Sequence, residues 1–242
     1  PGRFRIPSRR YGDHPDVLLC VSGILRTMAV WRAVAKRFSR HFTVIIFDMP
    51  GVGRSEILQG GAHVTVEEQL AVVHALIEHA QPRGEVTLAG SSWGTAIAAG
   101  YASLQPDAVQ QLILSSFGMK PNAEMEQIVG QAQALYESRN YAAGADLIIR
   151  MFGQQIGESY KRQIESQFAN LSDENAAAFY EHCRNILKLG QLEDTVDLTR
   201  IKARTLIVNG AEDRIIDLDD MWKAKVLIPD CECLLVDGVG HF

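Results

Sequence analysis

Hydrophobic residues in the first half of the chain form short continuous runs that alternate with helical patterns. The runs cover 16–21 (DVLLCV), 42–47 (FTVIIF), 85–89 and 109–115. Continuous apolar runs of this length are typical of strands buried on both faces of a parallel sheet. Apolar residues at helical spacing fill 31–38, 66–77 and 95–104, and Thr65 is expected to cap the second of these helices. The pattern predicts a mostly parallel, doubly wound α/β sheet.

The pattern changes in the second half of the chain. From about 121 to 197 there is no strand pattern, only stretches rich in Ala, Glu and Gln, before strand patterns return at 204–208 (RTLIV) and 233–236 (CLLV). We therefore expect an α/β core formed by 1–120 and 198–242, and an all-helical lid inserted at 121–197 above the carboxyl ends of the strands. Its helices are expected to break near Gly144, Gly153, Gly157 and Gly190.

Composition and charge exclude several classes of protein. Hydrophobic residues make up 47% of the 242 residues and charged residues 22%, which is ordinary for a globular protein with a sizeable core. The 24 basic and 29 acidic residues give a net charge of −5, so no basic surface for nucleic acid or anionic lipid is expected. No apolar stretch has membrane-spanning length. The chain begins at Pro1 and stops at Phe242, and we expect both ends to be trimmed.

The four cysteines fit reduced thiols in a cytoplasmic protein better than a disulfide framework. Cys20 lies within an apolar run, and Cys231 and Cys233 lie in CECLLV, where strand alternation explains their spacing. His182 and Cys183 are adjacent on an expected helix, with no other ligand types at a useful spacing. We predict no metal site.

The segment GSSWG at 90–94 matches the pattern G-x-S-x-G, and it lies directly between an expected strand and an expected helix. Such a tight turn leaves no room for a Cβ atom two residues before or after the serine, which accounts for Gly90 and Gly94. Ser92 is therefore the candidate nucleophile. The backbone N–H of Trp93, at the helix N-terminus, is a candidate donor to a developing oxyanion.

A second oxyanion donor is expected in the loop after the first long strand. Gly23 permits a turn there, and the N–H of Ile24 is the favoured donor, with Leu25 as the fallback.

A serine hydroxyl needs a positioned base, and that base needs an orienting carboxylate. Of the seven histidines, His241 follows a strand end and a glycine loop, so its imidazole can lie over the carboxyl edge of the sheet. Asp213 follows the strand at 204–208, and the order Ser, Asp, His is that of the G-x-S-x-G fold. The other carboxylates near that strand end compete for this role: Glu212, Asp217, Asp219 and Asp220.

Several of these segments together resemble the α/β-hydrolase superfamily over nearly the whole chain: DMPGVGRS, GSSWGT, NGAEDR and DGVGHF. With VSG after the first strand and IVGQAQALYES in the lid, the chain also resembles one branch. That branch holds rhamnolipid-precursor synthases and β-hydroxyacyl carrier-protein:CoA transacylases or thioesterases. The resemblance implies a cofactor-free acyl-enzyme mechanism on Ser92, Asp213 and His241. It also implies a β-hydroxyacyl thioester substrate, presented on acyl carrier protein or CoA.

Apolar lid residues are expected either to line an acyl-chain tunnel or to form the core of the lid itself. With Gly23 and Leu25, the candidates for substrate binding are Leu135, Tyr136, Ile148 and Phe152, and Leu147 and Met151 have the same character. An acidic carrier protein would favour a basic patch near the pocket. The lid supplies Arg139, Arg150, Lys161 and Arg162 as candidates.

Two other functions stay open at this point. Proline iminopeptidases also carry Ser-Trp-Gly at this turn, and their chemistry would use lid carboxylates such as Glu124, Glu126 and Glu137 to bind a substrate amine. The chain could also be a ligand-binding member of the fold with little turnover. Acyl chain length, acceptor and oligomeric state are not set by the sequence.

Overall fold

The computed structural model describes residues 2–24, 26–152, 157–189 and 192–241, without the side chains of 151, 152, 189 and 193. The strands are β1 (Phe4–Arg5), β2 (Ser8–Tyr11), β3 (Val17–Val21), β4 (Thr43–Phe47), β5 (Glu56–Ile57), β6 (Val86–Ser91), β7 (Gln111–Ser115), β8 (Arg204–Gly210) and β9 (Cys231–Val236). The helices are α1 (Arg32–Phe38), α2 (Val66–Ala80), α3 (Trp93–Leu104), α4 (Ala123–Glu137), α5 (Tyr141–Phe152), α6 (Glu158–Ala169), α7 (Asp173–Leu189) and α8 (Asp219–Leu227). Short 3₁₀ turns lie at Met28–Trp31, Leu192–Asp194 and Leu198–Arg200.

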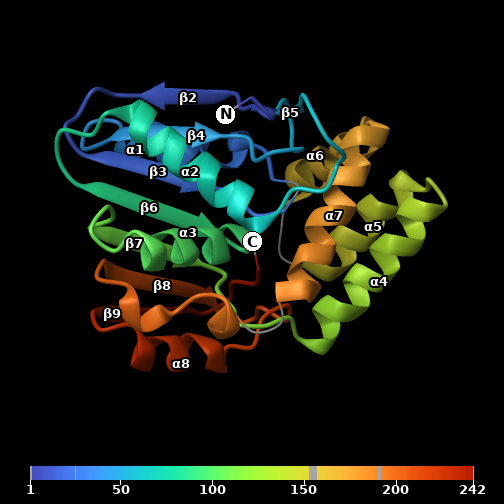
Figure 1. Cartoon of the computed structure of the whole chain (residues 1–242). Coiled ribbons are helices and arrows are strands. Elements are labelled where there is room, and N and C mark those ends of the chain that lie inside the picture. Colours follow the sequence, from blue (N-terminus) through green and yellow to red (C-terminus); the bar gives the residue numbers. More distant parts are fainter. Residues whose placement is uncertain (1, 25, 153–156, 190–191, 242) are drawn as a thin grey trace.

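A seven-stranded sheet in the order β2-β4-β3-β6-β7-β8-β9 forms the centre of the molecule (Figure 1). All neighbouring pairs are parallel except β2 and β4, which are antiparallel. This arrangement confirms the predicted fold class. The antiparallel edge strand β2 was not predicted, because SRRY is polar and largely exposed and therefore has no apolar pattern. Strands β1 and β5 and helix α8 were not predicted either.

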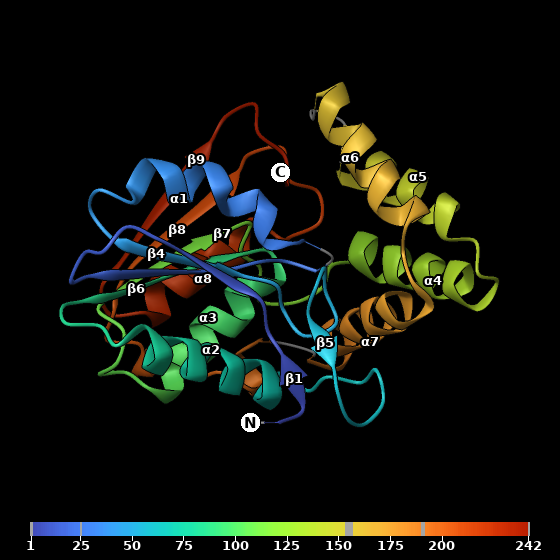
Figure 2. The same cartoon turned by 90° about the horizontal axis from the view of Figure 1, so that it is seen from above.

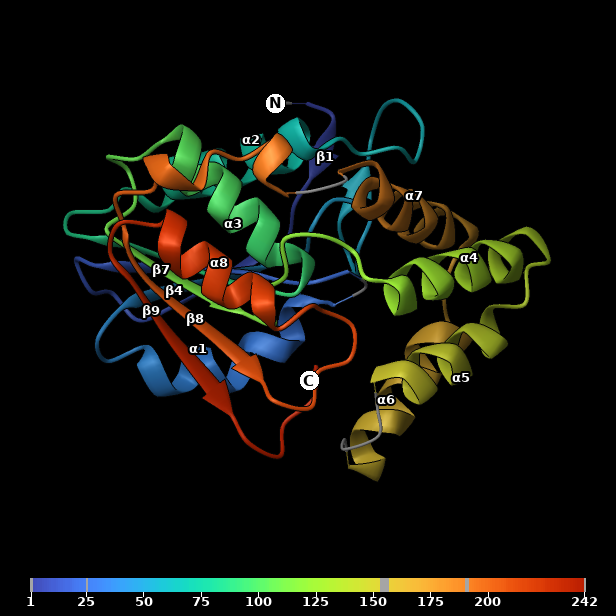
Figure 3. The ribbon, with the colours of Figure 1, turned by 90° about the horizontal axis from the view of Figure 1, so that it is seen from below.

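Helices cover both faces of the sheet, with α1 on one face and α2, α3 and α8 on the other (Figures 2 and 3). Alternate residues of a strand point to opposite faces, so β3 serves both layers. Leu18 and Cys20 pack with Ala35 of α1, whereas Leu19 packs in the cluster that contains Ile97 of α3. This two-sided burial explains why the strand sequences are continuously apolar.

The helical insertion, α4 to α7, leaves the core after β7 and returns before β8, and it lies at the end of the sheet where the parallel strands terminate (Figure 1). The described residues of this insertion form no strand. The expected break at Gly144 is wrong, since α5 runs through it. A Cβ there would lie 2.7 Å from the Phe168 ring, so this glycine allows α5 to pack closely on α6. Gly157 does precede α6, and Gly153 and Gly190 lie outside the described residues.

Helix α7 connects the insertion to the core through polar contacts with the segment that follows β4. Asn185 Nδ2 donates to the Val64 carbonyl at 2.7 Å, and His63 Nδ1 lies 2.8 Å from Glu181 Oε2. Between these, the ring of His182 is buried, and its Nε2 has no hydrogen-bond partner among the described residues. Burial lowers the pKa of His182 to about 4, because the charged imidazolium loses its hydration.

We expect His182 to make the fold sensitive to acid. An unfolded histidine binds a proton near pH 6.5 and His182 in the folded chain only near pH 4, so the unfolded state binds more protons between these values. The free energy of unfolding should therefore fall as the pH drops through this window, by an amount on the order of 3 kcal/mol for this group. His182→Gln should remove that part of the loss.

Urea titrations at pH 7, 5.5 and 4 give the free energy of unfolding of wild type and of His182→Gln. The difference between the two proteins isolates the effect of His182, because all other titrating groups are the same in both. The exposed His79 provides the matched control variant, His79→Gln. A difference between wild type and His182→Gln that stays constant from pH 7 to pH 4 would refute the assignment.

Candidate active site

Ser92 occupies a strained turn between β6 and α3. Its φ of 53° and ψ of −123° are unusual for a residue with a side chain, and its N–H donates to the Ser115 carbonyl at 2.9 Å. A Cβ on Gly90 would collide with the Gly94 carbonyl, and one on Gly94 with the Val21 carbonyl. Both glycines are therefore required by close backbone approach, as the sequence pattern indicated.

His241 lies between Ser92 and Asp213. His241 Nε2 is 2.9 Å from Ser92 Oγ, and His241 Nδ1 is 2.8 Å from Asp213 Oδ2. The side chains of Asp213 and His241 are almost completely buried, with exposed fractions of 0% and 2%. The structure thus brings together the three residues that the sequence singled out, in one chain of hydrogen bonds. Such a chain can draw the hydroxyl proton toward the imidazole while the carboxylate orients the ring.

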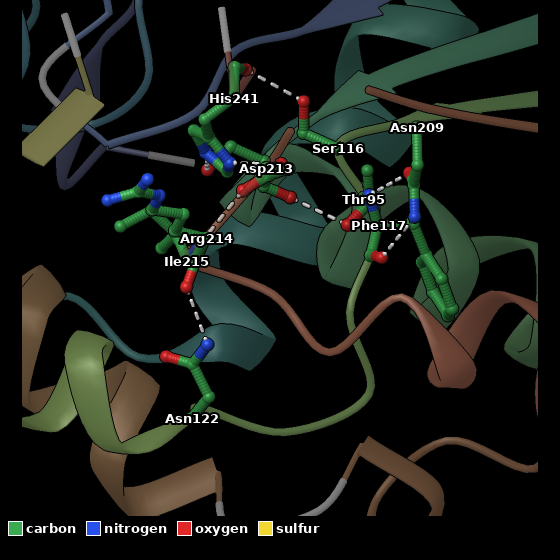
Figure 4. Close-up of polar contacts among 10 residues, drawn as sticks. Thr95, Ser116, Phe117, Asn122, Asn209, Asp213, Arg214, Ile215 and His241 are labelled. Carbon is green, nitrogen blue, oxygen red and sulfur yellow. Dashed lines mark hydrogen bonds and ion pairs between the residues drawn. The ribbon is translucent and has the colours of Figure 1, made fainter. Parts of the chain in front are cut away.

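Other residues hold these loops in place, and the sequence did not identify them (Figure 4). Ser116 Oγ donates to the His241 carbonyl at 2.8 Å, and Ile215 N donates to Asp213 Oδ1 at 3.0 Å. The Asn209 amide accepts from Phe117 N at 2.8 Å and donates to the Phe117 carbonyl at 2.9 Å, which joins the ends of β7 and β8. Asn209 could have been suspected from the sequence, because it is a polar amide at the end of an apolar strand pattern and directly precedes the acidic loop.

The loop after β3 lies directly against Ser92. A Cβ on Gly23 would be 2.9 Å from Ser92 Cβ, so only glycine allows this approach. This contact places the backbone of Gly23 beside Ser92, and Trp93, the next residue after Ser92, begins α3. The buried Asp48 fixes the end of this loop, because its Oδ1 accepts a hydrogen bond from Met28 N at 2.6 Å.

A cavity of about 270 Å³ opens above Ser92 and His241, between the core and the helical insertion. Its wall is mostly aliphatic and aromatic, as is usual for a site that holds an apolar ligand. The lining includes Gly23, Ile24, Ile128, Ile148, Ile164 and Phe168.

The lid residues predicted to bind substrate do not all line this cavity. Ile148 lines the cavity above Ser92, but Leu135 and Tyr136 line a separate apolar space of about 20 Å³ inside the insertion. Tyr136 stacks there on Tyr180, with ring centroids 4.9 Å apart. These two residues therefore belong to the packing of the insertion, because α4 presents them to α5 and α7. Leu25 and the side chain of Phe152 lie outside the described residues.

A second, smaller cavity of about 70 Å³ meets the first at Ser92 and His241. It runs between the segment after β7 and the loop that carries Asp213, and its mostly apolar lining also includes Thr95, Ser116 and Lys120. Ser92 thus lies where a larger and a smaller space meet, and both spaces are mostly apolar.

The buried cysteines do not rival Ser92 as nucleophiles. All four cysteines are free, and Cys183 lines the larger cavity. Burial raises the pKa of the Cys183 thiol to about 12 and that of Cys20 further, so both stay protonated and unreactive at neutral pH. Among the described residues, no cluster of His, Cys, Asp or Glu side chains has the arrangement of a metal site. Nor does any described helix combine the length and apolar character needed to cross a membrane.

Comparisons with known proteins agree with this architecture. The (R)-3-hydroxydecanoyl-ACP:CoA transacylase of Pseudomonas aeruginosa is 23% identical over 250 residues, which cover 100% of this chain and 80% of the transacylase. The pimeloyl-[acyl-carrier protein] methyl ester esterase of Pseudoalteromonas atlantica is 25% identical, over 80% of this chain and 68% of the esterase. The crystal structure of MGS-M2, an alpha/beta hydrolase enzyme from a deep-sea metagenome library, superimposes with a TM-score of 0.83 at 18% identity, covering 98% of this chain and 87% of that chain.

These relatives confirm the predicted family and the likeness to the transacylase branch within it. The family model described as the alpha/beta hydrolase fold matches residues 16–242, almost the whole chain. The chain therefore belongs to the alpha/beta hydrolase fold family, and it is an enzyme of that family.

Proposed function

We propose that this enzyme is a serine-dependent acyl hydrolase or acyltransferase that acts on esters or thioesters, with β-hydroxyacyl thioesters as its substrate class. The observation that carries the proposal is the hydrogen-bonded chain Ser92–His241–Asp213 at the base of an apolar cavity. An apolar cavity suits an acyl chain, and the hydrogen-bonded serine suits attack on the carbonyl at its end.

The proposed reaction has two halves. In the first, His241 removes the proton of Ser92 as Oγ attacks the carbonyl carbon, and the oxyanion is held by the N–H groups of Ile24 and Trp93. The protonated imidazole then gives its proton to the leaving oxygen or sulfur, and the acyl group stays on Ser92 as an ester. In the second half, His241 removes a proton from the acceptor as the acceptor attacks the carbonyl carbon of this ester. The imidazole then returns the proton to Ser92 Oγ, which leaves as the free hydroxyl, and the acyl group passes to the acceptor. Asp213 stabilises the charged imidazolium throughout.

The two cavities suggest where the parts of a substrate lie. The acyl chain occupies the larger apolar cavity, and the leaving group or acceptor enters through the smaller one past Ser116 and Lys120. The acceptor is water in a thioesterase, a hydroxyl group in a synthase or a thiol in a transacylase. The names of two relatives, a hydroxydecanoyl-ACP:CoA transacylase and an acyl-carrier-protein esterase, support a carrier-bound acyl substrate. A cytoplasmic location stays a prediction that is based on the four free thiols.

The basic residues predicted to receive a carrier protein have local contacts. Arg139 lies 3.5 Å from Asp173, and Lys161 lies 2.7 Å from Glu158. Ion pairs of this kind at a protein surface are weak, so a carrier protein could replace them.

The structure does not favour peptide hydrolysis, the alternative that the sequence left open. The carboxylates proposed to bind a substrate amine, Glu124, Glu126 and Glu137, are exposed on α4, and none of them lines the cavity above Ser92. A substrate panel of β-hydroxyacyl-CoA thioesters, p-nitrophenyl esters and prolyl amides tests the choice. We expect turnover of the thioesters and esters, with a first-turnover burst of thiol or nitrophenol.

A serine-directed fluorophosphonate separates catalysis from mere binding. We expect one adduct per chain, on Ser92. A folded protein that forms no adduct would refute every acyl-enzyme mechanism, and a preference for prolyl amides would refute acyl transfer as the function.

A further inference from the structure

The lining residues of α7 show that the spaces near Ser92 follow one another along the insertion. Ile186 lines both of the cavities that meet at Ser92, whereas Cys183 lines only the larger one. Phe179 lines the larger cavity and also the separate apolar space inside the insertion, and Ala176 lines that space alone. These residues are three or four positions apart and therefore share one face of the helix. The larger cavity thus extends from Ser92 along α7 to the space inside the insertion.

The other helices of the insertion give the same order. On α4, Met125 lines both cavities at Ser92, and Leu135, further along the helix, lines only the space inside the insertion. On α6, Ile164 lines the larger cavity and Leu171 lines the space inside the insertion. The larger cavity therefore has Ser92 at one end, and the space inside the insertion lies beyond its other end.

The aromatic rings of Phe168 and Phe179 separate the larger cavity from the space inside the insertion. Both residues line both spaces, as does Ile148 of α5, and the two rings meet edge to face with centroids 6.2 Å apart. Phe168 is only 5% exposed, and a Cβ on Gly144 of α5 would lie 2.7 Å from its ring. Close packing from α5 and α7 therefore holds the Phe168 ring in place as a wall between the two spaces.

We propose that Phe168 is the specificity-determining residue for acyl chain length, because its ring closes the end of the cavity that lies away from Ser92. This inference rests on the proposed function, which supplies the acyl group. Ile186 and Phe179 are seven residues apart, which corresponds to about 10 Å along α7 at ~1.5 Å per residue. A saturated chain advances by about 1.3 Å per carbon when its C–C bonds are about 1.5 Å long, so roughly eight carbons fit before the ring. The enzyme therefore accepts medium-length acyl chains.

A purely structural role is the competing explanation for Phe168, since it also packs in the core of the insertion with Ala145 and Ile164. Loss of that packing would lower activity on every chain length alike. Loss of the wall would instead change the preference among chain lengths. A longer chain could then pass the position of the ring and enter the space inside the insertion, whose lining is apolar.

The test measures kcat/KM of wild type, Phe168→Ala and Phe168→Leu on saturated p-nitrophenyl esters whose acyl chains run from four to sixteen carbons. In Phe168→Ala we expect the optimum to move to longer chains. The ratio of kcat/KM for a chain four carbons above the wild-type optimum to kcat/KM at that optimum should rise about ten-fold or more, as befits methylenes that gain a pocket. Phe168→Leu disturbs the packing less and should shift the optimum in the same direction by a smaller amount.

Leu147→Ala is the matched control. Leu147 is 2% exposed and lines the space inside the insertion but not the cavity above Ser92, so this variant disturbs the same packing and leaves the wall intact. Its optimum should match wild type. An unchanged optimum in both Phe168 variants, or an equal shift in Leu147→Ala, would overturn the proposal. Calorimetric binding of saturated fatty acids to Ser92→Ala and to Ser92→Ala/Phe168→Leu reads the length limit without turnover. If wild type turns over none of the esters, the proposed function fails, and the binding limit still decides the role of Phe168.

Discussion

Replacing Ser92 by alanine is expected to lower kcat for ester and thioester substrates by about 10⁴-fold or more, while the protein stays folded. The variant removes the atom that would attack the carbonyl and leaves the cavity and the His241–Asp213 contact in place. Burst kinetics and fluorophosphonate labelling measure the loss. Residual activity within ten-fold of wild type would show that another group performs the chemistry.

Ser92→Gly gives this experiment a structural control. It should be as inactive as the alanine variant yet more stable, by roughly 1 kcal/mol, because glycine accepts a φ of 53° without the strain that a side chain causes there. Urea unfolding of the two variants measures the difference. Equal stabilities would mean that the turn stores no strain at this residue.

Replacing Asp213 by asparagine is expected to lower kcat by about 10⁴-fold with little loss of stability. Asparagine has the same shape, but it presents no carboxylate to His241 Nδ1, which lies 2.8 Å from Asp213 Oδ2. The imidazole would then take the wrong tautomer and lose the charge that stabilises its protonated form. Steady-state kinetics with a p-nitrophenyl ester measure the effect.

The neighbouring acidic residues are the matched controls for this prediction. Glu212→Gln and Asp217→Asn change carboxylates that compete with Asp213 in sequence, and neither residue lines either cavity at Ser92. Both variants should keep kcat within about three-fold of wild type, as surface changes away from a site do. A loss in Glu212→Gln or Asp217→Asn as large as in Asp213→Asn would mean that the wrong carboxylate was chosen.

Much of the fold was predictable because its signals are local. The apolar runs of β3 and β4 and the helical spacing of α2 follow from which neighbours along the chain share a face. Thr65 caps α2 as expected, with Glu68 completing a capping box. The turn at Ser92 was readable from the pattern G-x-S-x-G, and the need for Gly90 is local because a Cβ on it would meet the Gly94 carbonyl, whereas the need for Gly94 comes from the Val21 carbonyl of β3.

The tertiary structure alone decided which distant groups meet. Asp213 and Asp217 lie in the same acidic segment, and only the packing of that loop brings Asp213 to His241. The helical spacing of α4 shows that Leu135 is apolar, but not whether it faces a substrate cavity or the helices α5 and α7. Nor does any local pattern predict the cation–π contact between Arg26, in the loop after β3, and Tyr160 of α6. The sequence by itself therefore determined the elements and the residue types that carry the chemistry, since hydrophobic periodicity and backbone sterics act between near neighbours. Which side chains share a cavity depends on sheet order and helix packing over long sequence separations, and only the folded chain expresses these.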